Sequence, residues 1–289
     1  PADSSLPPPA APTPPPLPSL HAARGSAPFE WGPTLSAAGV SASPALLAAL
    51  ASLPAPAPAP DSRPRALLPF SGDPATASDP SLVAALAAHD IVGIPFDILA
   101  DPADDATAAA ARARLIQQLA TPACRVGAIF AAPPCSPYSI LRGDADAPQL
   151  FDRDGPIEPC PPAWAAYRDK HLSLGAFTAD LCALADHLGK AWFIEQPADV
   201  GEPGSDAFWP AKAHHGSFFG SAAVARLTAS SSTRRVTFAQ CSFGGIYRKW
   251  TTLFYSSAAH PFLHSWSGFG CVHGHTRHAA TAAGHSSEG

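Results

Sequence analysis

The chain has 289 residues, of which 46% are hydrophobic and only 14% are charged, with a formal net charge of −5. This length allows one sizeable domain or two small ones with a real core, although the 35 prolines and abundant alanine reduce that core. The acidic balance excludes a polybasic nucleic-acid-binding protein, so any contact with DNA requires a local basic face.

Cysteine usage and hydropathy indicate the compartment. Six cysteines in a chain of this length do not form a secreted disulfide framework, and they favour a reducing environment. No apolar run approaches the roughly 20 residues of a membrane span, and no signal peptide is visible. We therefore expect an intracellular protein without membrane contact, with the nucleus as one candidate location. The chain lacks methionine, so we expect a processed chain or a fragment of a longer polypeptide; its composition predicts no oligomeric state.

The first predicted segment, residues 1–64, is dominated by Pro, Ala and Ser. Such a composition buries little and favours extended polyproline II, so we expect a disordered arm. One exception is a short helix after Ser43-Pro44, where a capping residue precedes a first-turn proline and the following leucines share one face.

From residue 65 to 256, short apolar runs alternate with helical patterns. This alternation predicts an α/β domain with a doubly wound, mostly parallel sheet, closed by a C-terminal β-hairpin. In chain order we predict a strand at 66–70, a helix at 79–88, a strand at 91–96, a helix at 104–119, a strand at 125–130, a long loop at 143–162, a helix at 164–188, a strand from 191, a helix at 221–229, and hairpin strands at 236–241 and 250–255.

Cys135 is the first candidate functional residue. It follows the apolar strand and the pair Pro133-Pro134, which cannot continue a strand ladder. The turn therefore holds the thiol at the carboxyl end of the strand, where ligands bind in open α/β sheets. The alternative is that Cys135 is an ordinary small apolar residue.

A second strand repeats the pattern 60 positions later, where Glu195 and Gln196 precede Pro197. We expect Glu195 to lie at the same sheet edge as Cys135. A thiol and a carboxylate on two strand ends form a plausible pair of nucleophile and acid.

These two motifs, Pro-Pro-Cys-Ser after one strand and Glu-x-Pro after another, resemble those of the cytosine-C5 DNA methyltransferases. More narrowly, the stretch from Leu67 to His278 resembles the divergent methylase-like domains of algal retroelement polyproteins. Those domains also end in Gln-Cys-x-Phe-Gly, a Lys-x-Thr-Thr segment and a Cys/His cluster. The resemblance implies a sheet of the class I S-adenosylmethionine methyltransferase type.

The resemblance also implies the chemistry. The Cys135 thiolate would add to C6 of cytosine, Glu195 would contact N3 of the base, and S-adenosylmethionine would supply the methyl group. The target base has to be flipped out of a duplex, and the expected partner is nucleic acid, with DNA preferred. The predicted substrate-binding residues are Ser136, Ser139, Arg142, Gln196 and Arg248. For the loop residues Ser136, Ser139 and Arg142 the alternative is an ordinary solvated turn.

The cofactor is expected at the first two strand ends. Phe70, Ser71 and Gly72 match the start of the family's Phe-x-Gly-x-Gly, but the second glycine is missing. Asp97 is expected to bind the ribose and Asp104 the adenine, with Pro133 completing the predicted cofactor set. The structural alternatives are a strand-end cap for Asp97 and a helix cap for Asp104.

Two departures from the family favour an alternative, a catalytically inactive nucleic-acid-binding or assembly module. The Gln-x-Arg-x-Arg strand is absent as such, with Arg234-Arg235 and Arg248-Lys249 as the nearest basic groups. Only 94 residues follow Glu195, which is too few for a full target-recognition domain.

The Cys/His-rich tail at 257–289 indicates a possible metal site. Cys241, Cys271, His275 and His278 would form a tetrahedral Cys2His2 zinc site that fixes the hairpin to the tail. The alternatives are a polar, histidine-rich tail without metal, and a zinc-stabilised interaction domain in which Cys135 has no catalytic role.

Overall fold

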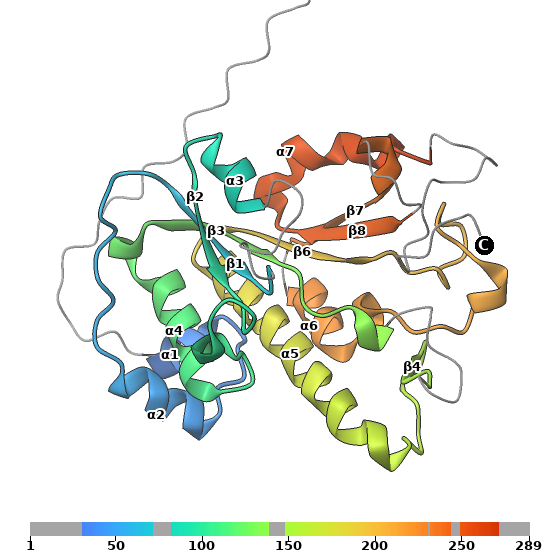
Figure 1. Cartoon of the computed structure of the whole chain (residues 1–289), viewed down its shortest axis with the longest axis horizontal. Coiled ribbons are helices and arrows are strands. Elements are labelled where there is room, and N and C mark those ends of the chain that lie inside the picture. Colours follow the sequence, from blue (N-terminus) through green and yellow to red (C-terminus); the bar gives the residue numbers. More distant parts are fainter. Residues whose placement is uncertain (1–30, 72–81, 139–147, 231, 244–248, 272–289) are drawn as a thin grey trace, which may run out of the picture. The chain divides into compact units, whose positions relative to one another are not determined.

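The computed structural model describes residues 31–71, 82–138, 148–230, 232–243 and 249–271. Its centre is a six-stranded sheet with the strand order β2-β1-β3-β6-β8-β7 (Figure 1). The strands are β1 (Arg65–Pro69), β2 (Val92–Phe96), β3 (Val126–Ala131), β6 (Ala191–Pro197), β7 (Arg234–Ala239) and β8 (Trp250–Tyr255). The first four are mutually parallel, and β8 runs antiparallel to both of its neighbours. This is a mostly parallel α/β sheet, compatible with a Rossmann-like fold.

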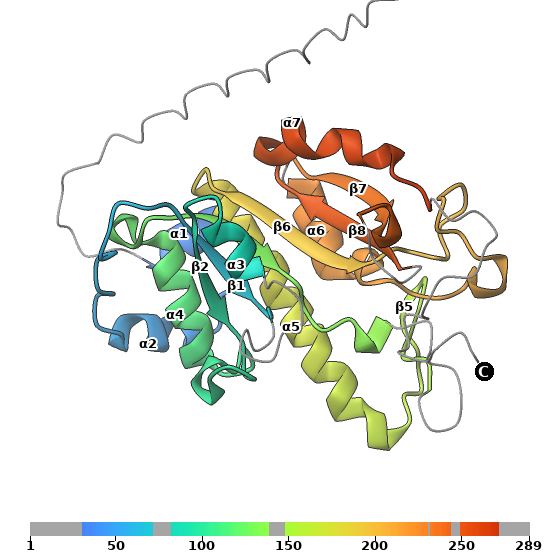
Figure 2. The ribbon, with the colours of Figure 1, turned by 45° about the horizontal axis from the view of Figure 1, so that its top comes forward.

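Helices cover both faces of the sheet, as the alternation of strands and helices predicts. Figures 1 and 2 show α4, α5 and α6 on one face and α3 and α7 on the other. The helices are α1 (Trp31–Ala37), α2 (Pro44–Ser52), α3 (Leu82–Ala87), α4 (Ala109–Ala120), α5 (Pro162–His187), α6 (Ala222–Ser230) and α7 (His260–Leu263). No helix within the described ranges is long and apolar enough to cross a membrane.

The alternating side chains of β6 supply both layers of the core. Trp192 and Ile194 are fully buried in the larger cluster, which α4, α5 and α6 complete. Phe193 points to the opposite face and packs against a smaller cluster formed by β7, β8 and α7. The strand that carries Glu195 is therefore held from both sides.

The boundary predicted at residue 64 differs from the observed one. Leu35, Leu46 and Leu50 are buried in the main core, and the compact unit begins at Trp31. The expected helix is present as α2, and the Ser43 hydroxyl accepts a hydrogen bond from the backbone N–H of Leu46 (3.2 Å). Its leucines bury enough apolar surface to join residues 31–64 to the domain, while residues 1–30 lie outside the described part.

The helix predicted from Asp104 begins later, at Ala109. The reason is local competition for backbone donors. Asp101 accepts a hydrogen bond from the N–H of Ala103, and Asp105 accepts from the N–H of Thr107. These Asx turns keep the segment out of the α-helix.

The C-terminal hairpin is confirmed, since β7 and β8 pair antiparallel. The second strand joins it to the sheet, because β8 lies between β6 and β7. The segment from residue 257, predicted as a Cys/His-rich tail, begins with regular structure. The short helices η7 (Ser257–Ala259), α7 and η8 (His264–Gly268) follow β8, and Ala259 and Leu263 are buried against the hairpin.

The predicted loop after the thiol also contains structure. Its described part forms a small antiparallel pair, β4 (Phe151–Asp152) and β5 (Gly155–Pro156). Gly216 lies directly on this pair, and a Cβ atom there would lie 2.3 Å from the carbonyl oxygen of Asp152. Only glycine allows this close approach without a backbone shift.

A cavity of about 280 Å³ lies between α2, α4 and α5. Leu46, Arg112 and Asp180 are among its lining residues. Burial raises the pKa of the Asp180 carboxyl to about 6, although the charges of Arg226 and Arg112 partly oppose this.

Leu50→Ala is expected to lower the free energy of unfolding by about 2–5 kcal/mol, because it removes a side chain that is 2% exposed and leaves a cavity. Urea unfolding of the full chain measures this loss. Leu99→Ala is the control, since Leu99 is 73% exposed and its truncation should change stability by less than about 0.5 kcal/mol. Equal, small effects of the two changes would contradict the packing of α2 on the domain.

Asp180→Asn is expected to stabilise the fold near neutral pH. A raised pKa means that the folded state prefers the protonated acid, so ionisation costs stability once the pH exceeds the ordinary value of 3.8, and the full cost is present above about 6. After allowance for solvent screening, the gain should be about 1 kcal/mol at neutral pH and absent at about pH 4. Urea unfolding at both pH values tests this, with the exposed Asp154→Asn as control. A gain independent of pH would refute this explanation.

Candidate active site at the carboxyl ends of the strands

The parallel strands bring several predicted site residues to one edge of the sheet. Because β1, β2, β3 and β6 are parallel, their carboxyl ends share that edge. The chain leaves β1 toward β2 and then returns to place β3 on the other side of β1. In open α/β sheets a switch point of this kind, here between the ends of β1 and β3, is the usual ligand position.

Cys135 is exposed at this edge, in a loop that is anchored on both sides of it. Before the thiol, the carbonyl of Pro133 accepts a hydrogen bond from the side-chain amide of Gln196 in β6. After it, Tyr138 is buried, with its ring stacked on Phe151 at a centroid distance of 4.5 Å. The backbone N–H of Tyr138 also donates to the carbonyl of Cys135 (2.9 Å). The loop thus presents the thiol to solvent on a fixed backbone.

Glu195 lies within β6 rather than after it, because its pairing with Leu253 of β8 extends the strand to Pro197. Relative to β3 it is nevertheless at the edge, since Ala131, the last residue of β3, pairs with Ile194. The side chain of Glu195 is 22% exposed, and one of its oxygens lies 3.3 Å from Nζ of Lys249. Lys249 directly precedes β8 and places a positive charge beside this carboxylate.

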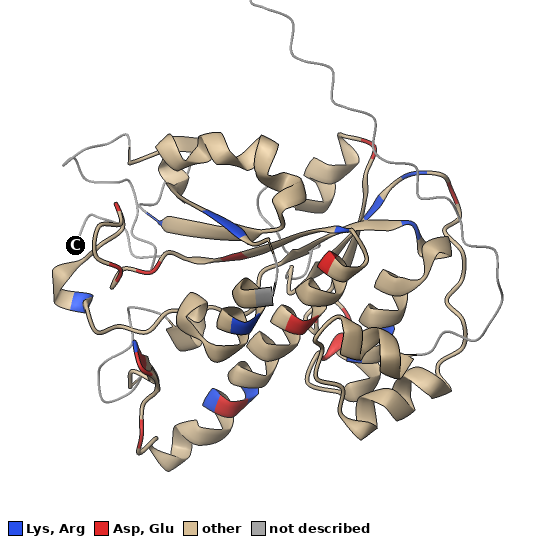
Figure 3. Cartoon of the chain, turned by 180° about the vertical axis from the view of Figure 1, so that it is seen from behind, with Lys and Arg blue, Asp and Glu red and all other residues tan. Residues whose placement is uncertain are grey.

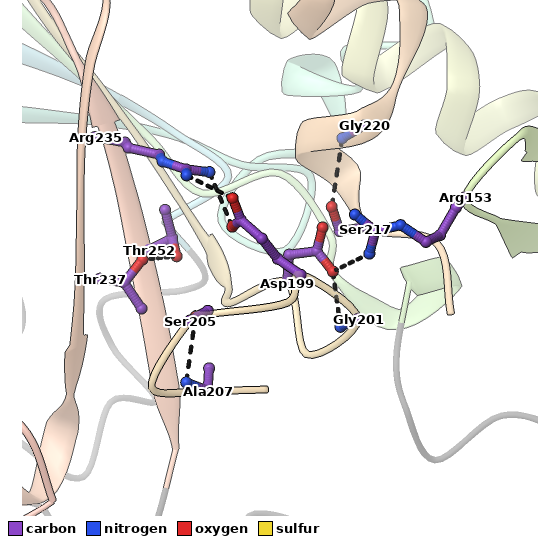
Figure 4. A network of polar contacts seen from close by, with 11 residues as sticks. Arg153, Asp199, Gly201, Ser205, Ala207, Ser217, Gly220, Arg235, Thr237 and Thr252 are labelled. Atoms are coloured by element: carbon purple, nitrogen blue, oxygen red, sulfur yellow. Dashed lines mark hydrogen bonds and ion pairs between the residues drawn. The ribbon is translucent and has the colours of Figure 1, made fainter. Parts of the chain in front are cut away.

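The loop that follows β6 is fixed by two ion pairs (Figure 4). Arg153, at the β4–β5 turn, lies 3.2 Å from the carboxylate of Asp199, which also accepts the N–H of Gly201 (2.9 Å). Arg235 of β7 donates twice to Glu202, at 2.9 and 2.5 Å. The segment beyond Glu195 is therefore tied to both neighbouring elements.

The predicted cofactor residues are only partly brought together. Phe70 and Asp97 follow β1 and β2, and the N–H of Phe70 donates to the carbonyl of Phe96 (2.9 Å). Phe70 has a left-handed backbone with φ of 64°, a conformation that costs a non-glycine residue about 1–3 kcal/mol and turns the chain sharply out of the sheet. Ser71 is exposed next to it, and Gly72 lies outside the described residues.

The two predicted cofactor carboxylates have structural contacts. Asp97 is 8% exposed, and its oxygen accepts the N–H of Leu99 (2.9 Å), as expected of a strand-end cap. Asp104 lies 2.9 Å from the guanidinium of Arg114, and it does not cap α4. Burial raises the pKa of Asp104, while the hydrogen bond from Arg114 lowers it.

The predicted substrate residues divide in a similar way. Ser136 is exposed beside the thiol, and its hydroxyl lies 2.6 Å from that of Tyr167 on α5. Gln196 is 1% exposed, points to the opposite face from Glu195, and ties the two loops together through its hydrogen bond to Pro133. Ser139, Arg142 and Arg248 lie outside the described residues.

The two described cysteines of the predicted zinc site lie on segments that contact each other. Cys241 is buried in η6 (Gln240–Phe243), and Cys271 is half-buried. The N–H of Ala239 donates to the carbonyl of Phe269 (3.0 Å), and the hydroxyl of Ser242 donates to the carbonyl of Gly270. His275 and His278 lie outside the described residues, and within the described ranges no three potential ligands gather. The zinc site therefore stays a prediction.

Sequence reasoning missed Tyr138 and Lys249 as parts of this arrangement. Tyr138 follows Cys135 by three residues, and a large aromatic at that spacing could have been recognised as an anchor for the loop. Lys249 was noted only as a basic group near β8, because its contact with Glu195 depends on the order of strands in the sheet.

Cys135 is expected to be alkylated by iodoacetamide in the folded protein much faster than Cys182 or Cys124. Cys135 is exposed, whereas the other two thiols are buried, and burial raises the pKa of both and so lowers their thiolate fraction. Peptide mass spectrometry over a time course measures the three rates. In denaturant the rates should converge; equal rates in the folded protein would contradict the exposed position of Cys135.

No family model matches the chain, and no curated protein matches it significantly. The function is therefore best argued from the residues at the sheet edge.

Proposed function

We propose that the chain methylates C5 of cytosine in DNA, with Cys135 as the nucleophile and S-adenosylmethionine as the methyl donor. The observation that carries this proposal is the adjacency of two strand ends, one followed by an exposed thiol and the other carrying a carboxylate. Their loops are joined by the hydrogen bond between Gln196 and Pro133. Both motifs also resemble those of the cytosine-C5 methyltransferases.

The chemistry requires a covalent step, because C5 of cytosine is a weak nucleophile. Addition of the Cys135 thiolate to C6 forms a carbon–sulfur bond and moves the electron pair of the C5–C6 double bond to C5. With a proton on its carboxyl group, Glu195 would donate a hydrogen bond to N3 and limit the negative charge that develops on the ring. The electron pair at C5 would then take the methyl group from S-adenosylmethionine, which leaves as S-adenosylhomocysteine. Transfer of the C5 proton to a water molecule and departure of the thiolate restore the double bond.

Bound S-adenosylmethionine would supply an electrophilic methyl group to C5. The switch point between β1 and β3 is the position that fits it best, with Phe70 and Asp97 directly after β1 and β2. The left-handed turn at Phe70 carries the chain out of the sheet at the end of β1, and Asp97 follows the neighbouring strand β2. These residues fit the cofactor in part, since Asp104 is engaged by Arg114.

The ion pair between Glu195 and Lys249 supports the proposal from the side of the acid. Lys249 extends from the start of β8 to the carboxylate, and so it holds this side chain at the edge where a base would enter. It also supplies a positive charge where the family's Gln-x-Arg-x-Arg strand is missing.

The alternative is a methylase-like module that binds nucleic acid without catalysis. The carboxylates of Asp97 and Asp104 favour this alternative, because both make contacts within the protein, whereas in a functional cofactor site they would bind the cofactor. The exposed thiol of Cys135 on an anchored loop favours catalysis, because a cysteine that served only to pack the core would be buried. Covalent trapping separates the two proposals.

Wild-type chain with S-adenosylmethionine should form a covalent complex with DNA that contains 5-fluorocytosine, because fluorine at C5 cannot leave as a proton. Cys135→Ser should abolish this complex, and Glu195→Gln should slow its formation about 100-fold or more. Denaturing gel electrophoresis with labelled DNA measures the complex.

Cys160→Ser is the matched control, since Cys160 is half-buried just before α5 and takes no part in the proposed chemistry. It should trap DNA at the wild-type rate. Absence of trapping by the wild type, with intact folding and bound DNA, would favour the non-catalytic module.

A further inference from the structure

Four aromatic rings gather where β7 ends: Phe238, Phe243, Trp266 and Phe269. Phe243 is central, with ring centroids 5.3 Å from Phe238 and 5.0 Å from both Trp266 and Phe269. Phe238 is buried in the smaller core cluster, but Phe243 is 50% exposed and Phe269 42% exposed. Two aromatic rings therefore meet solvent on a rigid base, a surface that we call the ring pair.

The ring pair adjoins the candidate active site. The N–H of Gln240 donates to the carbonyl of Lys249 (2.9 Å), and the side chain of Lys249 reaches Glu195. Strand register places Phe238 opposite Thr251 and Glu195 opposite Leu253, so both belong to the same face of the sheet. The base of the ring pair and Glu195 therefore lie on one face of the sheet.

The charge of this region differs from that of the rest of the chain. Between Ala207 and Cys271 the sequence contains no Asp or Glu, whereas it contains six Lys or Arg residues. Figure 3 shows blue segments on β7 and no red on β7, β8 or α7. In a chain with a net charge of −5 this stretch is locally basic, which favours a polyanion, although Arg235 is paired with Glu202 and Lys249 with Glu195.

We propose that the ring pair binds single-stranded DNA by stacking one unstacked base on Phe243 and another on Phe269, whose ring planes are inclined by 74° to each other, with Arg234 of the hairpin near the phosphates. This inference deepens the proposed function and rests on it, because it names the form of the substrate. Aromatic rings beside a positive surface are the general means of holding single strands, whereas in a duplex the faces of the bases are stacked and inaccessible. A cytosine in a single strand also reaches Cys135 without the cost of being flipped out.

The structure formed by the residues after Glu195 supports single-stranded DNA as the ligand. The described residues there form α6, the β7–β8 hairpin and the short helices that cover the hairpin. α6 packs into the larger core cluster, and the hairpin with its short helices completes the sheet and the smaller cluster, so recognition falls to exposed side chains. The two exposed rings are the group among them best suited to bases.

Fluorescence anisotropy of the full chain with a labelled single-stranded DNA 15-mer tests this inference. The same sequence is measured as duplex DNA and as RNA. Wild-type chain should bind the single strand at least about tenfold more tightly than the duplex, and Phe243→Leu with Phe269→Leu should weaken single-strand binding about tenfold or more. Leucine keeps the apolar volume, and unchanged melting temperatures show that the variants fold.

Phe262→Leu is the matched control, because Phe262 is 68% exposed on α7 and belongs to no ring contact of this cluster. It should bind the single strand as the wild type does. Equal affinity for the duplex, tighter binding of RNA, or no effect of the double variant would each overturn the inference. Trapping on 5-fluorocytosine DNA tests the proposed function separately. If the double variant traps DNA as fast as the wild type, the proposed methylation stands and the role of the ring pair is refuted. If single-strand binding depends on the two rings but no covalent complex forms, the ring pair stands and the proposed methylation is refuted.

Discussion

The arrangement at the sheet edge depends on one hydrogen bond, from the side-chain amide of Gln196 to the carbonyl of Pro133. It joins two loops that are 63 residues apart in sequence and that carry the candidate nucleophile and the candidate acid. Because Gln196 is 1% exposed, water cannot easily replace either partner, and loss of the amide would leave a buried carbonyl without a donor. The position of Cys135 relative to Glu195 is thus set by a buried contact.

Side chains of β6 alternate between the two faces of the sheet, so neighbouring residues serve the core and the candidate site in turn. Trp192, Ile194 and Gln196 point into the larger core, and Phe193 and Glu195 point to the other face. A one-residue slip would bury the carboxylate and expose the indole, which the core prevents. The register of β6 therefore fixes which polar group reaches the site.

The sequence patterns predicted the alternation of strands and helices, the hairpin and the strand end at Pro133, because these depend on local runs of apolar residues and on proline. They predicted the helix whose leucines share one face, but assigned it to a disordered arm because of the prolines around it, whereas Leu46 and Leu50 belong to the main core. They also placed the start of α4 at Asp104, where side-chain turns compete with the helix. The partners of Glu195 depend on β8 lying next to β6, which no local pattern contains.

Charge is unevenly distributed along the carboxyl edge of the sheet, and this favours different positions for the two proposed ligands, S-adenosylmethionine and DNA. Every acidic residue except Glu288 precedes Ala207, and Asp97 and Asp104 follow the strand β2 on the cofactor side. S-adenosylmethionine carries a positive sulfonium, so a side rich in carboxylates attracts it, whereas a polyanion is attracted to the β7–β8 side. Glu195 and Lys249 lie between the two, as a paired acid and base with little net charge. A region with little net charge suits an uncharged nucleobase better than it suits the phosphates of the DNA backbone.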